Sequence, residues 1–166
     1  MNAAVWFGAS LFFMVGVAPA FFSPEMKKHF GDIWTGVIAF IVFERYFALQ
    51  YWCGAIAIAH QFAEWVYLGR PLQRAMIGAA FGVFVLGLVG GLWVQPRIER
   101  YHAVKYGKPD LYSPQQKATA AKSLSVLHGV SRVAGLFSLV GLAFYMWRMG
   151  NPPNPPRFVP SSKFRS

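Results

Sequence analysis

The chain has 166 residues, of which 55% are hydrophobic and only 13% are charged, a composition typical of a membrane domain rather than of a soluble one. Its formal net charge of +10 does not indicate nucleic-acid binding, because the basic residues fall in the connections between hydrophobic runs and in the C-terminal tail. Anionic lipid head groups are their expected partner. With one cysteine, Cys53, the chain can form neither an intramolecular disulfide nor a cysteine metal cluster.

The first hydrophobic run, residues 3–22, contains no charged residue. Its length as a helix matches about 30 Å of hydrocarbon. A cleaved signal peptide is the alternative, but no basic segment precedes the run, and the run exceeds the usual length of a signal-peptide core. Pro19 and Pro24 end the helix, and residues 23–32 are expected to form a connection in water. We predict an uncleaved transmembrane helix.

The second run, residues 31–68, is long, mostly apolar and free of proline. A continuous helix of this length would measure about 57 Å, nearly twice the hydrocarbon thickness. We therefore place the span at 46–67 and treat 34–43 as an extension of the helix beyond the bilayer. The reason is that Glu44 and Arg45 are accommodated at least cost near the interface. A break in the helix near Glu44 is the alternative.

The third run, residues 76–94, has no charged residue, and Pro96 is expected to end it. Its glycines have the spacing that lets two helix backbones approach closely in lipid. We favour packing within the chain over a dimer contact for both pairs. The pairs are Gly78 with Gly82, and Gly87 with Gly91.

The longest connection, residues 97–122, is expected to lie at the surface, and Ser113-Pro114 is typical of the start of the helix that contains the fourth span, 124–147. The tail, residues 151–166, holds five prolines and is predicted to be extended. We expect it to dock on a partner through Arg157, Phe158 and Phe164.

The predicted fold is therefore all-α: an integral membrane four-helix bundle whose second helix extends beyond the bilayer, with a proline-rich extended tail. Four spans place both termini and the turn at Gly69 on one face of the membrane. The other two connections lie on the opposite face.

Polar residues inside the predicted spans are the candidates for a functional site. His128 and Arg132 share one face of the fourth helix. We predict that Glu44 neutralises Arg132 and that His128 lines the same pocket, because an unpaired charge is costly at membrane depth. His60 and Glu64 also share a helix face, and we interpret them as a hydrogen-bonded pair near the interface. A zinc ion there would have two ligands, where zinc takes three or four.

Two histidines on two helices raise the alternative of haem b ligated by His60 and His128. From the predicted spans, the two side chains lie about 16 Å apart along the membrane normal. Axial ligands must face one iron from nearly equal depth. We therefore expect no cofactor and no metal site.

Several short stretches, taken together, resemble a known family. They are Trp6, Val17-Ala18-Pro19-Ala20, the run from Gly31 to Tyr46 ending in Phe43-Glu44-Arg45-Tyr46, Trp93-x-Gln95-Pro96-Arg97 and His128-Gly129-x-Ser131. These motifs resemble the transmembrane protein 205-like family, which is catalogued in bacteria as a domain of unknown function. The resemblance covers about residues 3–148 and implies a four-helix integral membrane protein without established catalytic residues. Arg132 departs from the family's pattern.

Two functions remain open from the sequence. The first is a non-catalytic membrane protein of the bacterial inner membrane, an accessory or scaffold subunit that docks on other membrane protein subunits. The second is a small redox or transport protein that uses His60, Glu64, His128 and Arg132. An absorption spectrum separates the two, because a haem protein shows a Soret band. The sequence shows neither an internal repeat nor a discontinuous helix pair, which are the usual signs of a transporter.

Overall fold

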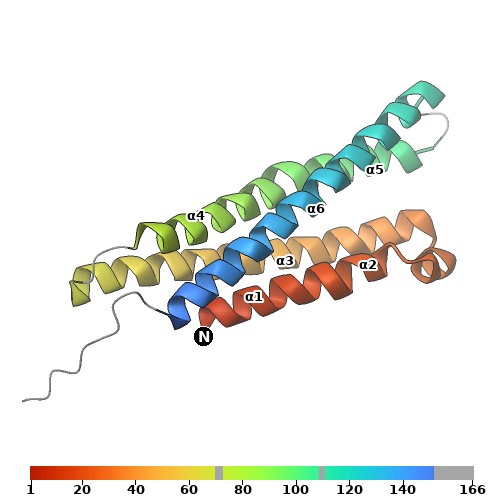
Figure 1. Ribbon diagram of the computed structural model, residues 1–166. Coiled ribbons are helices and arrows are strands. Elements are labelled where there is room, and N and C mark those ends of the chain that lie inside the picture. The colour runs from red at the N-terminus through yellow and green to blue at the C-terminus, as the bar shows by residue number, and fades with distance from the viewer. Residues whose placement is uncertain (70–72, 109–110, 152–166) are drawn as a thin grey trace, which may run out of the picture.

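The computed structural model describes residues 1–69, 73–108 and 111–151, and every regular element in these ranges is a helix. The helices run back and forth along one long direction (Figure 1), which confirms the predicted all-α fold. In chain order the elements are α1 (Asn2–Phe12), the π-helical η1 (Phe13–Val17), α2 (Ala18–Phe21), α3 (Pro24–Leu68), α4 (Arg74–Val89), the π-helical η2 (Gly90–Val94), α5 (Gln95–Tyr106) and α6 (Pro114–Gly150).

These elements form four helical rods: the first is α1 with η1 and α2, the second is α3, the third is α4 with η2 and α5, and the fourth is α6. Three of the four rods are long and apolar enough to cross a membrane: Asn2–Phe21, Arg74–Tyr106 and Pro114–Gly150. The rod formed by α3 is the longest helix but is not among them. A membrane location thus follows for three rods, and the span at 46–67 stays a prediction.

The start of α3 is bent at Gly31, whose φ of 70° and ψ of 164° favour glycine. Ser23 caps the helix by accepting a hydrogen bond from the Met26 backbone N–H at 3.3 Å. An ion pair between Lys27 and Asp32, at 3.6 Å, spans the bend. Gly31 is the position inside α3 where the backbone departs from helical geometry. The break considered near Glu44 was therefore placed too late in the chain.

The segment after Pro96 corrects a second expectation. We expected Pro96 to end the helix and residues 97–122 to form a surface connection, but α5 continues past Pro96 to Tyr106. Pro96 is the second residue after η2, and the wider π-turn accommodates a residue that disrupts regular α-helical bonding. The predicted start of α6 is confirmed, because Ser113 and Gln116 form a reciprocal capping box.

The core lies where all four rods meet, toward the N-terminal end of α1. Trp6 has no exposed surface, and Leu142 and Tyr145 are almost fully buried. The Asn2 side-chain amide donates to the Cys53 carbonyl oxygen at 2.8 Å and fixes the start of α1 on α3. The core side chains are Ala3, Trp6, Cys53, Ala57, Met76, Ala80, Val83, Leu142 and Tyr145.

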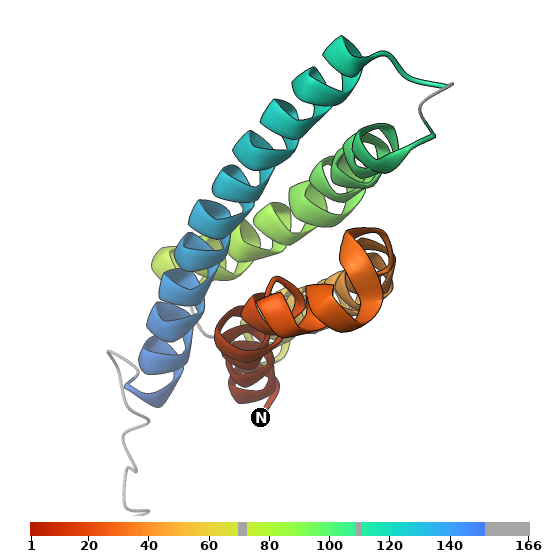
Figure 2. The same cartoon turned by 90° about the vertical axis from the view of Figure 1, so that its right-hand side faces the viewer.

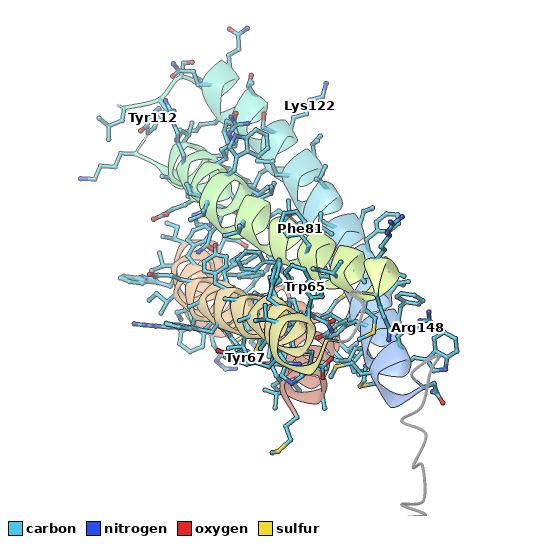
Figure 3. The ribbon with its side chains drawn as sticks, turned by 90° about the vertical axis from the view of Figure 1, so that its left-hand side faces the viewer. Trp65, Tyr67, Phe81, Tyr112, Lys122 and Arg148 are labelled. Carbon is cyan, nitrogen blue, oxygen red and sulfur yellow. The ribbon has the colours of Figure 1, made fainter. Side chains whose placement is uncertain are left out.

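Away from this core the rods form two hairpins, one of α1, α2 and α3 and one of α4, α5 and α6 (Figure 2). The labelled side chains mark the two ends of the bundle: Tyr67 and Arg148 lie near one end, Tyr112 and Lys122 near the other (Figure 3). Both termini of the helical part and the Gly69 turn are therefore at one end. This arrangement agrees with the predicted topology.

Candidate functional site

A pocket of about 430 Å³ lies between the first half of α3 and α5, a volume within the range of small-molecule sites. The side chains that line it from α3 are apolar except for Glu44. From α5 it is lined mostly by polar ones. The contributions are Ile33, Val37, Phe40, Ile41 and Glu44 from α3, and Gln95, Glu99, His102, Ala103 and Tyr106 from α5.

His102 joins the two walls of this pocket. Its Nε2 lies 3.3 Å from the Asp32 carbonyl oxygen, and because a carbonyl only accepts, Nε2 carries the proton. The imidazole stands edge-on to the Phe40 ring, with centroids 5.3 Å apart, and tilts against Tyr106 at 4.7 Å. The close approach requires Gly36, because a Cβ there would collide with the His102 ring.

The charge of His102 follows from its surroundings. It lies on α5, which carries several charged residues and continues beyond the apolar run 76–94. Burial lowers the pKa of His102 from its usual value, and the hydrogen bond to Asp32 opposes this effect only in part. His102 is therefore mainly neutral at pH 7.

Glu44 and Glu99 give the pocket its negative charge. The ion pairs within the described ranges are Lys27–Asp32 and His60–Glu64, so neither pocket carboxylate is in one. Arg97 instead stacks over the Trp93 ring at 3.6 Å. The pocket thus combines an apolar wall with two carboxylates that lack a basic partner among the described side chains.

The structure does not bring Glu44 and Arg132 together. Glu44 lines the pocket between α3 and α5, whereas α6 packs on α1, α4 and α5. Arg132 is exposed on α6, and no described carboxylate lies within ion-pair distance of it. The half-buried His128 stands edge-on to Phe22, with ring centroids 5.3 Å apart. The expected cluster is not formed because α6 packs on the side of the first and third rods and not against the Glu44 end of α3.

The His60–Glu64 pair is present near the end of α3, with 3.9 Å between Nδ1 and Oε1. That separation fits an ion pair with a protonated ring and is too long for a direct hydrogen bond. His60 lies toward the Gly69 end of the bundle and His128 toward the Phe22 end. Over the described ranges, no three His, Cys, Asp or Glu side chains are grouped closely enough to hold a metal ion. The tail residues Arg157, Phe158 and Phe164 lie outside the described residues.

The two glycine pairs have different surroundings. A Cβ on Gly91 would collide with Phe47 and Tyr51, and one on Gly87 would contact Gln50 at 3.5 Å. This pair therefore packs against α3, within the chain. Gly78 and Gly82 are exposed, with no atom within 4 Å of an added Cβ.

The sequence analysis missed a buried polar network around Gln50. The Gln50 side-chain oxygen Oε1 accepts a hydrogen bond from the Trp6 indole N–H. Its amide nitrogen donates to Ser10 Oγ at 2.8 Å and to the Tyr46 hydroxyl, and Ser10 in turn donates to the Trp6 carbonyl at 2.7 Å. Gln50 is an isolated amide in an apolar run, and that isolation was the available signal. Nothing in the local pattern pointed to Trp6 as its partner.

The fold and these sites define a helical membrane protein in which three rods are apolar enough to cross a bilayer. The chain belongs to the family described as domain of unknown function (DUF4149), whose profile matches residues 1–107. No curated protein and no solved structure matches the chain.

The matched range ends with α5, so it includes the α3–α5 pocket and the Gln50 network but not α6. The resemblance at His128-Gly129-x-Ser131 therefore lies outside it. The more specific similarity to the transmembrane protein 205-like family stays a prediction.

Proposed function

We propose that this protein is a non-catalytic accessory subunit whose helix α6 docks against an acidic transmembrane helix of a larger complex in the bacterial inner membrane. Arg132 is the observation that carries the proposal. It is exposed near the middle of α6, and the described part of the chain offers it no carboxylate within ion-pair distance. An arginine at the centre of a membrane helix costs about 2.5–3.5 kcal/mol on insertion scales. A carboxylate supplied by a partner would offset that cost.

The surface around Arg132 suits a helix as partner. An exposed stripe of side chains follows α6 at helical spacing. Its first two members, Ser125 and Gly129, are small and precede Arg132 by about two turns and one turn. An added Cβ on Gly129 meets no atom within 4 Å, so a second helix can approach the backbone there closely. The members of this α6 stripe are Ser125, Gly129, Arg132, Leu136, Val140, Ala143 and Trp147.

The interior of the bundle supports a structural role. The polar side chains around Gln50 satisfy one another. Each is therefore engaged in holding α1 to α3 rather than facing a substrate. The tail, residues 151–166, remains a proposed second contact with the same partner.

The test is site-specific crosslinking in native membranes. It is followed by reversal of the charge at Arg132 and then at the partner's carboxylate. A photoreactive residue in place of Leu136 is expected to crosslink α6 to a transmembrane segment containing Asp or Glu, which mass spectrometry identifies. Arg132→Asp is expected to reduce recovery of this partner at least about thirtyfold, since breaking a desolvated charge pair costs at least about 2 kcal/mol. Changing the partner's carboxylate to arginine should then restore recovery.

Lys122→Asp is the matched control, because Lys122 is an exposed basic residue on the same face of α6 that lies before the predicted span 124–147, where a charge needs no partner inside the bilayer. Its partner recovery should equal that of the unchanged protein. The proposal fails if Arg132→Asp leaves recovery unchanged, if the crosslinked segment lacks an acidic residue, or if the crosslink joins two copies of this chain.

A further inference from the structure

We propose that the pocket between α3 and α5 binds an amphipathic amine: a protonated amino group held between Glu44 and Glu99, with an apolar chain lying along α3. This site is separate from the α6 stripe. The inference therefore does not depend on the proposed function.

The electrostatics of the pocket select a cation. The chain carries a formal charge of +10 and contains only six acidic residues, yet two of the six line this one pocket. The lining includes no lysine or arginine, and His102 is mainly neutral. A ligand ammonium group would therefore meet two carboxylates, and hydrogen bonds to charged groups are the stronger class.

The polar α5 wall is preorganised for such a ligand. Gln95 donates to the Phe40 carbonyl oxygen at 3.3 Å, and His102 donates to the Asp32 carbonyl oxygen at 3.3 Å. Each of these bonds runs from an α5 side chain to the α3 backbone, so the two walls stay at a fixed separation without the carboxylates. Glu44 and Glu99 are thereby left available for a ligand.

The apolar α3 wall would contact the hydrocarbon chain of the ligand. Ile33 is 51% exposed and Ile41 is 55% exposed, and together with Val37 they form the pocket's aliphatic side. This part of α3 precedes the predicted span, at the level where lipid head groups meet water. A chain of methylene groups laid on this wall would lose contact with water at about 0.8 kcal/mol per group, and its amine would remain at the interface.

The experiment measures the binding of octylamine to the purified protein in maltoside micelles by isothermal titration calorimetry, with empty micelles as the baseline for partitioning. Octanol has the same chain without the charge and is expected to bind at least about tenfold more weakly. Glu44→Gln and Glu99→Gln should each weaken octylamine binding about tenfold, since each removes one charged acceptor. Glu25→Gln is the matched control, because Glu25 is an exposed acid at the start of α3; it should leave the affinity unchanged.

A second arm separates the two sources of such an amine. Native mass spectrometry of the protein released from mixed phosphatidylethanolamine and phosphatidylglycerol shows which lipid remains bound. Retention of phosphatidylethanolamine that is lost in Glu44→Gln identifies a lipid head group. Octylamine binding without such retention identifies a free amine. Equal affinity for octylamine and octanol, or unchanged octylamine affinity in both glutamine variants, overturns the proposal.

Discussion

Replacing Gln50 with leucine is expected to destabilise the bundle by about 2–4 kcal/mol, the larger of two strong stability effects that the structure predicts. The substitution leaves the buried Trp6 indole N–H without an acceptor and the Tyr46 hydroxyl without its amide donor. A buried polar group without a partner costs about 1–3 kcal/mol. Leucine fills a similar volume, so the loss comes from hydrogen bonding rather than from a cavity.

The free energy of unfolding can be measured by titrating the protein in maltoside micelles with dodecyl sulfate. Gln115→Leu, at an exposed position in the first turn of α6, is the control and should stay within about 0.5 kcal/mol of the unchanged protein. In a double-mutant cycle, adding Trp6→Phe to Gln50→Leu should cost less than Trp6→Phe alone. Strict additivity of the two substitutions would contradict a direct Trp6–Gln50 bond.

The second strong effect is expected at Gly91. In Gly91→Leu the new side chain starts at a Cβ that lies 3.0 Å from Phe47 Cβ and collides with the Tyr51 hydroxyl. The Phe47 Cβ is fixed to its backbone and cannot swing aside, so η2 must move away from α3. Overpacking of this kind costs about 1–3 kcal/mol.

Gly82→Leu is the matched control, because it makes the same substitution in α4, the helix that precedes η2. Nothing lies within 4 Å of a Cβ at Gly82, and leucine favours a helix over glycine by up to about 1 kcal/mol. The same detergent titration should therefore show Gly82→Leu at or above the stability of the unchanged protein. Equal destabilisation by both substitutions would mean that helix propensity, and not contact with α3, sets the effect.

The sequence was sufficient for the number of helical rods and for their antiparallel order, but not for the length of the third rod. The charge-free runs around Ala9 and Val83 and the helix start at Ser113-Pro114 are local signals. Local signals can be recognised without knowing which helices pack against one another. The same holds for Gly87 and Gly91, whose spacing indicated close packing.

The sites were harder to predict because they depend on contacts between rods. Arg132 and Glu44 were paired because both lay at a similar expected depth, but depth alone does not fix which face each helix turns to its neighbours. His102 and Glu99 were assigned to a surface connection because Pro96 was taken to stop the helix. The pocket became visible only when the continuation through η2 placed them against α3.

Because the helix continues through η2, the number of residues in η2 also determines the pocket. A π-turn holds one residue more than an α-turn. It therefore changes the direction in which every later side chain of the rod points. Removing a single residue from Gly90–Val94 would turn everything after it by about 100°, the angle of one residue at 3.6 residues per turn. Glu99 and His102 would then face away from α3 although neither had been changed. Chain length within this one turn therefore determines whether the pocket exists, independently of the residues that line it.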